Sequence, residues 1–193
     1  LTTFQPVDND DKNLTINGSL SKGLMSGRIT LSLDAGYKQE WATSMRQNTE
    51  LPYILKTVAV QPNLKGYFTK WFSVDYRLLY TNNALNINED EKSNYQVLKQ
   101  NLTFTFVPDT DWQIAAGGEH YYTRFSSGNS VNLVLLDASV RWSVSKRVDL
   151  SVVGMNFLNK REYRYASYGM LDETNYMYGL RGRNVMASIQ IRL

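Results

Sequence analysis

The side chains best suited to bind a ligand are tyrosines that lie close together toward the carboxyl end of the sequence. Three tyrosines stand between residues 163 and 168, and Tyr176 and Tyr178 follow in the same stretch. A tyrosine ring offers a large rigid face and a polar tip, which suits sugars or aromatic chelators. We predict a substrate-binding site at these residues and at two more near residue 120: Tyr163, Tyr165, Tyr168, Tyr176, Tyr178, Tyr121 and Arg124.

Residues that could support catalysis or hold a metal are sparse. His120 is the only histidine, and catalysis would require oriented partners that the sequence does not identify. The segment Asp8-x-Asp10-x-Lys12 begins like a calcium loop but lacks the third ligand and the glycine. The acidic run 88–91 is expected to be surface charge. We therefore predict no catalytic residue, no metal site and no cofactor.

The elements that position these residues are strands, because apolar and polar residues alternate through most of the sequence. The last nine residues, from Val185 to Leu193, alternate most plainly: odd positions are apolar, whereas Ser188, Gln190 and Arg192 are polar. The pattern predicts about nine antiparallel strands, near 14–21, 29–38, 57–68, 72–81, 98–106, 112–119, 136–144, 148–152 and 180–193. Pro62 weakens the third, because proline removes a ladder donor.

The predicted connections alternate between short and long. Short ones fall at 25–28, 69–71, 108–111 and 145–147, and longer polar ones at 42–52 and 82–94. Outer-membrane barrels have this arrangement, with tight periplasmic turns and longer external loops. Residues 1–13 are then expected to form an extracellular loop, and residues 14–193 the strands with their turns and loops.

Aromatic residues gather at both ends of the predicted strands. One group lies near the short turns, and the other includes Tyr37, Trp41, Tyr53, Tyr80, Tyr95, Tyr121 and Tyr122. Two belts separated by aliphatic residues are typical of rings at two membrane interfaces. A place in the outer belt is an equal alternative to ligand binding for Tyr163 and Tyr165, whereas ligand binding or loop packing is favoured for Tyr168, Tyr176 and Tyr178.

Composition narrows the class of protein further. The chain has 193 residues, 42% of them apolar, and a mean hydropathy of −0.39, without a run of about 18 apolar residues. These values exclude a bundle of membrane helices but not a barrel, whose polar lumen face dilutes its lipid face. The absence of cysteine excludes disulfide scaffolds. The net charge of +3 is modest, and we expect no nucleic-acid partner.

The last 50 or so residues resemble the end of TonB-dependent outer-membrane transporters, most closely those of Bacteroidota. In that family an Asn-x-Leu/Phe-Asn-Lys stretch followed by a tyrosine leads into the last external loop, and an arginine-bearing stretch opens the closing strand. Here Asn156, Asn159, Lys160, Tyr163 and Arg183 stand at matching positions. The chain ends in Leu193, where the family usually has an aromatic residue.

The resemblance implies a 22-stranded barrel in the bacterial outer membrane, with an N-terminal plug and a TonB box, that imports a scarce nutrient such as a siderophore, cobalamin, glycan or peptide. It implies contacts with outer-membrane lipid, with the TonB complex through an N-terminal region outside these residues, and with a surface lipoprotein. An odd number of strands leaves the first strand without a partner, so we expect a C-terminal piece of a larger barrel. A further strand near 161–168 would change that count.

We therefore predict an all-β, antiparallel transmembrane barrel segment that moves a solute and is not an enzyme. Two alternatives remain open. A barrel protease or lipase requires an acid, base or nucleophile clustered at one rim. A soluble or cell-surface ligand-binding β-sandwich requires the aliphatic faces of its strands to meet in one dry core.

Overall fold

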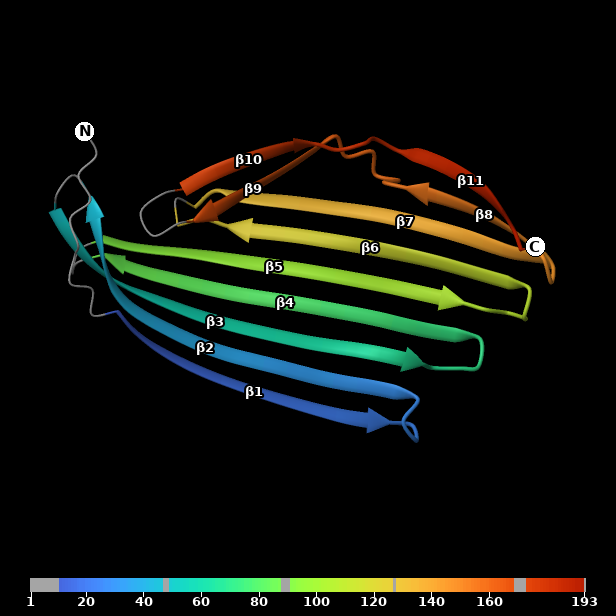
Figure 1. Cartoon of the computed structure of the whole chain (residues 1–193), viewed down its shortest axis with the longest axis horizontal. Helices are drawn as coiled ribbons and strands as arrows, with labels where there is room; N and C mark the ends of the chain where they lie inside the picture. Colours follow the sequence, from blue (N-terminus) through green and yellow to red (C-terminus); the bar gives the residue numbers. More distant parts are fainter. Residues whose placement is uncertain (1–10, 47–48, 88–90, 127, 169–172, 193) are drawn as a thin grey trace.

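A computed structural model of the chain contains one curved antiparallel sheet of nine strands and a separate two-stranded hairpin (Figure 1). It describes residues 11–46, 49–87, 91–126, 128–168 and 173–192, without the side chains of 44–46, 91, 165–168 and 173–175. The strands are β1 (Lys12–Leu24), β2 (Ile29–Arg46), β3 (Thr49–Tyr67), β4 (Phe72–Ile87), β5 (Glu91–Phe106), β6 (Trp112–Arg124), β7 (Ser130–Ser145), β8 (Val148–Met155), β9 (Glu162–Tyr168), β10 (Glu173–Gly179) and β11 (Asn184–Ile191).

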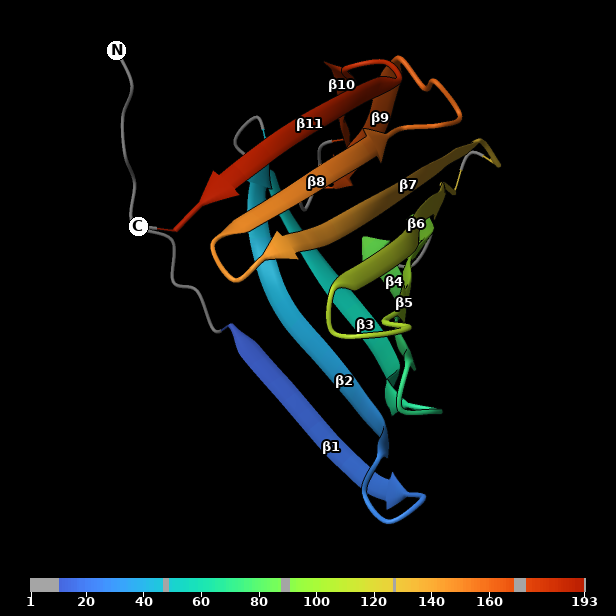
Figure 2. The same ribbon diagram turned by 90° about the vertical axis from the view of Figure 1, so that its right-hand side faces the viewer.

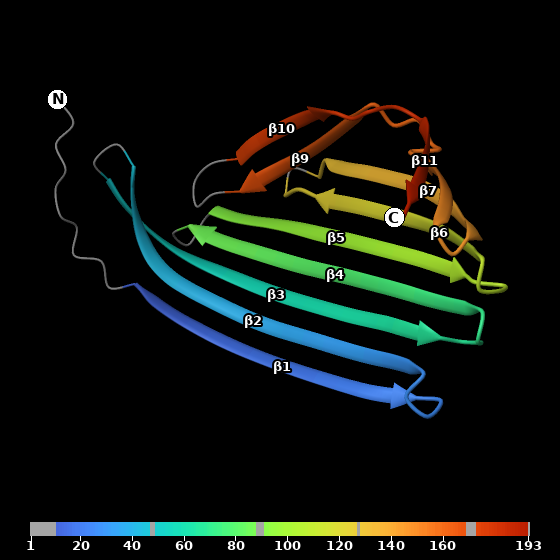
Figure 3. The ribbon, with the colours of Figure 1, turned by 45° about the vertical axis from the view of Figure 1, so that its right-hand side comes forward.

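Each strand of the sheet pairs with its neighbours in the sequence until β8, which pairs with β11. The sheet curves into an arch, with β1 and β11 as its two edges on the same open side (Figure 2). The hairpin β9–β10 interrupts the connection between β8 and β11 and lies toward the end of the sheet away from the short turns (Figure 3). The all-β antiparallel fold is thus confirmed, whereas closure into a barrel and the size of that barrel remain predictions.

The alternation of the sequence gives this sheet two unlike faces. One face carries polar side chains such as Asp34, Asp75 and Asp149, and the other carries apolar ones such as Leu33 and Val140. Cross-strand partners share a face, so both properties continue from strand to strand through the register. Three hollows of the curved sheet open on the polar face. We therefore call that face the inner face and the apolar one the outer face.

The described part of the chain has almost no dry core. Ile29, Tyr53, Phe125 and Leu133 are its only buried hydrophobic side chains. Outer-face residues are open instead: Leu20 is 70% exposed and Ile189 69%. Because the described residues form one layer and not two packed sheets, the arrangement differs from the sandwich alternative, in which the aliphatic faces meet.

The strands extend beyond the predicted boundaries. The polar stretches expected to be the connections 42–52 and 82–94 largely belong to β2, β3, β4 and β5. Likewise β1 begins at Lys12, inside the expected loop 1–13, and the stretch after β8 contains the two strands β9 and β10 in addition to the nine predicted. Residues 1–10, with most of the calcium-like segment, and 88–90, with most of the acidic run, lie outside the described residues.

The short turns lie where they were predicted. At the first one, Met25, Ser26 and Gly27 all have positive φ, of 50°, 55° and 84°, and the backbone N–H of Gly27 donates to the carbonyl of Leu24. Pro62 lies inside β3 opposite Leu33. The pairing of β3 with β4 is interrupted at Gln61 and Pro62 and resumes at Asn63 in the same register, so the proline does not end the strand.

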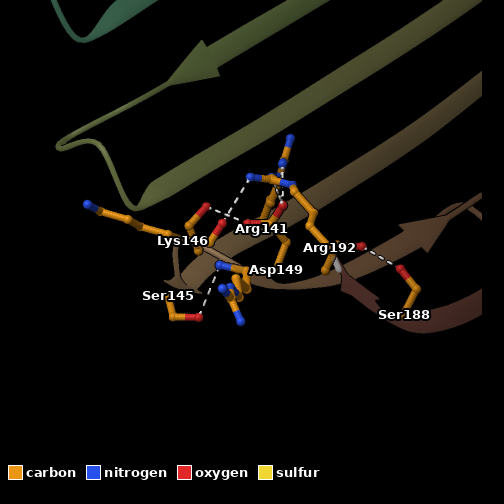
Figure 4. Close-up of polar contacts among 9 residues, drawn as sticks. Arg141, Ser145, Lys146, Asp149, Ser188 and Arg192 are labelled. Carbon is orange, nitrogen blue, oxygen red and sulfur yellow. Dashed lines mark hydrogen bonds and ion pairs between the residues drawn. The ribbon is translucent and has the colours of Figure 1, made fainter.

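The closing strand pairs with β8 as predicted, and Asp149 fastens it near the turn between β7 and β8. The buried Asp149 carboxylate accepts hydrogen bonds from Arg141 Nη2 at 2.6 Å and Ser143 Oγ at 2.7 Å. It also forms an ion pair with Arg192, the residue that directly follows β11 (Figure 4). Higher on β11, Ser188 Oγ lies 2.7 Å from Ser151 Oγ. These contacts hold β11 to β7 and β8 from the inner face.

The described residues contain no helix of the length and apolarity needed to cross a membrane.

A charge on the outer face should destabilise the protein far more than a charge on the inner face. Leu33 lies in the middle of the outer apolar part of β2, and the next residue, Asp34, is exposed on the inner face. In lipid, we expect Leu33→Lys to cost roughly 2–4 kcal/mol and Asp34→Lys only about 0–0.5 kcal/mol. Urea titration of the protein refolded in lipid vesicles measures both. Equal losses would contradict the assignment of the two faces.

Candidate membrane-facing surface and ligand site

The outer face carries an apolar band of constant width. Its limits are set by apolar or aromatic side chains in the following segments: 29–37 on β2, 58–66 on β3, 72–80 on β4, 98–106 on β5 and 134–142 on β7. Each segment has nine residues, which fits the 9–11 residues that a tilted strand needs to cross a bilayer. The band is therefore the surface that would contact lipid chains.

The limit of this band away from the short turns runs obliquely across the register. Outer-face polar residues begin at the partners Gln39 and Lys56 on β2 and β3. On β4 and β5 they begin at the partners Asn82 and Gln96, which lie one same-face step nearer the turns. On β7 they begin at Asn132, the partner of Tyr122 and one further same-face step nearer the turns, whereas Gln100 and His120 form a polar pair inside the band. A level boundary meets tilted strands at steadily shifting register positions, so one flat interface accounts for all of these limits.

Aromatic rings mark the other limit of the band, near the turns. The Trp112 and Trp142 rings stack at 5.3 Å and 8° between cross-strand partners. Phe72 stacks on Phe104 at 6.1 Å and 13°, and Trp71 meets Phe106 edge-on at 5.1 Å. These rings are exposed on the outer face, as a girdle at a membrane interface would be.

The predicted second aromatic belt divides between the two faces. Tyr37, Tyr80 and Tyr122 lie on the outer face beside the polar boundary. Tyr53 and Tyr121, which the sequence analysis placed in the same belt, lie on the inner face. Tyr95 is also an inner-face residue, opposite Asn83. Closeness to a strand end does not tell the two faces apart, whereas an odd or even position along the strand does. The two groups were therefore predicted as one belt.

Beyond the polar boundary, the two faces exchange character. The outer face becomes largely polar, with the partners Trp41 and Ile54 as apolar exceptions, whereas the inner face acquires apolar cross-strand pairs such as Leu55 with Leu85 and Tyr121 with Leu133. Tyr53 and Leu133 are only 3% and 5% exposed. In a sheet with water on both faces, polar side chains are favoured at the more solvent-accessible positions. The pattern at this end of the sheet is typical of such a sheet.

Within the band, the inner face is hollow and charged. A hollow of about 400 Å³ is lined by Lys65, Asp75 and Arg77 with neighbouring small and polar residues. Arg77 donates to both Asp75 oxygens, at 3.0 and 3.1 Å, and Lys65 Nζ lies 3.6 Å from the same carboxylate. Such a surface suits water or polar solutes and not lipid.

The predicted tyrosine site is assembled in part. The Tyr121 and Tyr163 rings meet at 5.7 Å, which attaches β9 to the inner face of β6, and the Tyr121 hydroxyl donates to Glu119 at 2.8 Å. The Tyr176 and Tyr178 rings stack at 6.4 Å and 12°. Burial raises the pKa of Tyr163, so its hydroxyl stays protonated at neutral pH. Tyr165 pairs with Tyr176 and Tyr168 with Glu173 in the hairpin register, but the side chains of Tyr165 and Tyr168 lie outside the described residues.

Arg124 does not join the tyrosines. It lies on the outer face of β6, opposite in parity to Tyr121, and pairs with Gln96 of β5. Together with Asn94, Gln96, Phe125, Ser126 and Gly128 it lines a separate hollow of about 230 Å³. Arg124 stands three positions after Tyr121, and an odd separation in a strand places two side chains on opposite faces.

His120 lies on the outer face, as its parity predicted, in a row of neutral polar side chains. Its Nδ1 is 3.2 Å from the amide nitrogen of Gln100, and its Nε2 is 3.0 Å from Asn132 Oδ1. The Tyr76 hydroxyl donates to the other end of the Gln100 amide at 3.1 Å. None of these partners is a carboxylate, and the described residues contain no group of three ligands that could hold a metal.

Residues 156–161, which contain the Asn-x-x-Asn-Lys stretch, are hydrogen-bonded to residues 180–183, and we call these two segments the clasp. The clasp lies between the strand pair β8–β11 and the hairpin β9–β10. Asn156 is 7% exposed with a φ of 53°, and its side-chain nitrogen donates to the carbonyls of Lys160 at 2.7 Å and Arg181 at 2.9 Å. Its Oδ1 accepts from the Lys160 N–H at 2.9 Å. Its own N–H donates to Asp137 Oδ1 on β7 at 2.7 Å. One asparagine thus joins four parts of the chain.

A second asparagine completes the clasp. Asn159, also at a φ of 53°, accepts from the Arg183 N–H at 3.0 Å, and the Arg183 guanidinium donates to the Phe157 carbonyl at 2.6 Å. A Cβ on Gly182 would lie 2.6 Å from the Arg161 guanidinium carbon and 2.8 Å from Asn159 Oδ1, so a larger residue there would require these side chains to move. The structure therefore brings together Asn156, Asn159, Lys160 and Arg183, four of the residues that carry the family resemblance.

Replacing Asn156 should loosen the clasp. Asn156→Ala removes three side-chain hydrogen bonds and the residue type that favours positive φ, and we expect a loss of about 1–3 kcal/mol. Asn156→Gly keeps the backbone conformation accessible and separates the two contributions. Asn101→Ala on the inner face, which loses one 3.4 Å contact, is the matched control with an expected change within about 0.5 kcal/mol. Urea unfolding in lipid measures all three, and an unchanged Asn156→Ala variant would refute a stabilising clasp.

Comparisons with known proteins identify no family for this chain. Neither a protein-family model nor a curated protein matches the sequence. Two solved structures are similar: OmpT, an outer membrane protein of Vibrio cholerae, with 10% identity, a TM-score of 0.47 and 92% of this chain covered, and the ferric yersiniabactin uptake receptor FyuA from Yersinia pestis, with 9% identity, a TM-score of 0.48 and 92% covered. The chain spans 54% of the length of the first and 32% of the second.

Proposed function

We propose that this chain forms part of the wall of a transmembrane β-barrel in a bacterial outer membrane. The observation that carries the proposal is the nine-residue apolar band on the outer face, whose polar limit runs obliquely across the register as a flat interface would on tilted strands. Apart from the buried Ile29, the hydrophobic side chains of the band are exposed or partly exposed, and in lipid this exposure is favourable. In water it would be an aggregation surface.

The ends of the strands support an orientation. At one end of the sheet the strands are joined by short turns, and at the other end they extend beyond the apolar band. This asymmetry matches the periplasmic and external sides of outer-membrane barrels. In this orientation the hairpin β9–β10, the clasp and the inner-face tyrosines lie on the external side. The edges β1 and β11 require partners within lipid, which further strands of a larger barrel would supply. A barrel of 22 strands is the size implied by the family resemblance.

Within that wall we assign a transport role of the TonB-dependent kind. The polar, hollow inner face is suited to a solute path, and the clasp contains residues of the resemblance. The cargo would be a scarce nutrient: a siderophore, cobalamin, a glycan or a peptide. Coupling would pass through a plug and a TonB-box region outside these residues, and a surface lipoprotein remains a proposed partner. The protein would move its solute without transforming it.

The cargo would meet the inner-face tyrosines first. Tyr53, Tyr121 and Tyr163 line the external end of the inner face together with apolar side chains such as Leu133. Aromatic faces beside polar tips suit sugar rings and aromatic chelators. Tyr176 and Tyr178 extend the aromatic surface along the hairpin.

Membrane insertion can be tested by labelling single cysteines, because the sequence contains none of its own. Ala138 lies in the outer band of β7 and the next residue, Ser139, lies on the inner face. In membranes, we expect Ala138→Cys to react with a lipid-soluble maleimide only and Ser139→Cys with a small water-soluble one. Gln96→Cys, just beyond the band, should react with a membrane-impermeant maleimide added to intact cells.

The controls for this experiment are detergent-solubilised and urea-unfolded samples, in which all three cysteines should react with the water-soluble reagent. Equal reactivity of Ala138→Cys and Ser139→Cys in membranes would refute a lipid-facing band. Protection of Gln96→Cys on intact cells, with reaction after the cells are opened, would reverse the orientation.

Transport can be tested in cells with a panel of labelled solutes: a ferric siderophore, cyanocobalamin, an oligosaccharide and a peptide. We expect energy-dependent accumulation of one class. For that class, Tyr121→Ala and Tyr163→Ala should raise the apparent binding constant about 2- to 10-fold each, because each removes an aromatic contact. Tyr80→Ala, on the outer face of β4 and away from the solute path, is the control. Absence of energy-dependent uptake would refute the transport role but not the membrane wall.

A further inference from the structure

Beyond the apolar band, the outer face carries one sign of charge. Its cationic side chains there are Lys12, Lys56, Lys92 and Arg124. Amides lie between them at Gln39, Asn82, Asn94 and Gln96. We call this set the basic rim. Among the described outer-face side chains in this region, Glu50 is the only acid, and it lies farther from the band than Lys56.

The cations of the basic rim have no anionic partner among the described residues, and all four are exposed. The inner face at the same height differs. There, Lys38 pairs with Glu40 at 2.7 Å, and Glu119 lies near Lys99 in the register. The four rim cations thus lie on the face that continues the lipid-facing band, beyond the end of that band, whereas Lys38 on the inner face has an anionic partner.

The best-formed point of the rim is the hollow at Arg124. It holds about 230 Å³ and is lined by Arg124, Asn94, Gln96, Phe125, Ser126 and Gly128, so the one charged residue has amide-bearing and hydroxyl-bearing neighbours. A guanidinium flanked by neutral hydrogen-bond donors is suited to phosphate oxygens, which it can contact in pairs.

We infer that the basic rim binds the phosphate groups of lipids in the surrounding outer leaflet, most firmly in the hollow at Arg124. The inference rests on the proposed membrane wall and adds a ligand to its outer surface. The position of the rim along the strands favours a lipid headgroup as the ligand. The rim lies directly beyond the apolar band, where contacts with acyl chains would end and contacts with headgroups would begin. A soluble anion would gain nothing from that position.

The test uses the full-length protein in detergent with lipid A, a diphosphorylated glycolipid, as the probe. The variant Lys56→Gln/Arg124→Gln removes two rim cations. The matched control, Lys65→Gln/Lys99→Gln, removes two exposed cations from the inner face and changes the net charge equally. We expect the rim variant to bind lipid A weaker by on the order of tenfold, and the control to bind as the unmodified protein does.

Three results would overturn the inference: equal losses in the two variants, no loss in either, or equal binding of lipid A from which the phosphates have been removed. Glucose 1-phosphate and inorganic phosphate at millimolar concentration should not displace the lipid, and displacement would assign the hollow to a soluble phosphate instead. The Ala138→Cys labelling is independent of these results. A protein that inserts normally but binds lipid A without regard to the rim refutes this inference alone.

Discussion

Backbone N–H and C=O groups in a lipid environment have no water to pair with, and the rest of the structure depends on that constraint. Each strand in the nine-stranded sheet satisfies its neighbours' backbone groups, so in the proposed membrane wall the stability of the band would come from the ladder and from lipid, without buried side chains. This explains why so few hydrophobic residues are buried and why Leu20 and Ile189 can stand open on the outer face. The same constraint makes β1 and β11 the positions where the proposed wall must continue.

The constraint applies only as far as the band extends. Beyond it, the proposed wall has water on both faces. Tyr53 and Leu133 are buried on the concave side, while Lys56 and Gln96 lie on the outer face. Each long strand therefore crosses two solvents, and its faces exchange roles where the solvents meet. The aromatic girdle near the turns and the basic rim at the other limit are the chemical signs of the two interfaces.

This exchange also sets how much could be predicted from the sequence. Within the band, alternation located the strands, the short turns and the pairing of Val185–Ile191 with β8. Beyond it, the period of two persists with inverted faces, so the parts of β3 and β4 at 49–52 and 82–87 were predicted as polar connections. The division of the tyrosines, with Tyr121 inside and Tyr122 outside, follows from parity in the register and not from position near a strand end.

The clasp was the least predictable part. Its residues were noticed through a family resemblance, but their partners were not, because Asn156 reaches Arg181 across 25 positions that show no periodicity. Arg124 was misgrouped for a related reason: adjacency in sequence was used where the strand separates neighbours by face. Both cases concern contacts that depend on three-dimensional register.

The clasp also makes the last hairpin modular. Met155 and Asn184 are direct register partners on one side of it, and Glu162 pairs with Gly179 on the other, with the asparagine bonds between them. The chain thus leaves the wall and returns to it at neighbouring points that are fixed independently of whatever lies between. Insertions, deletions or a wholly different sequence in β9–β10 leave the register of β8 with β11 unchanged, so natural variation can alter the exposed hairpin while the part of the wall within the membrane is inherited intact.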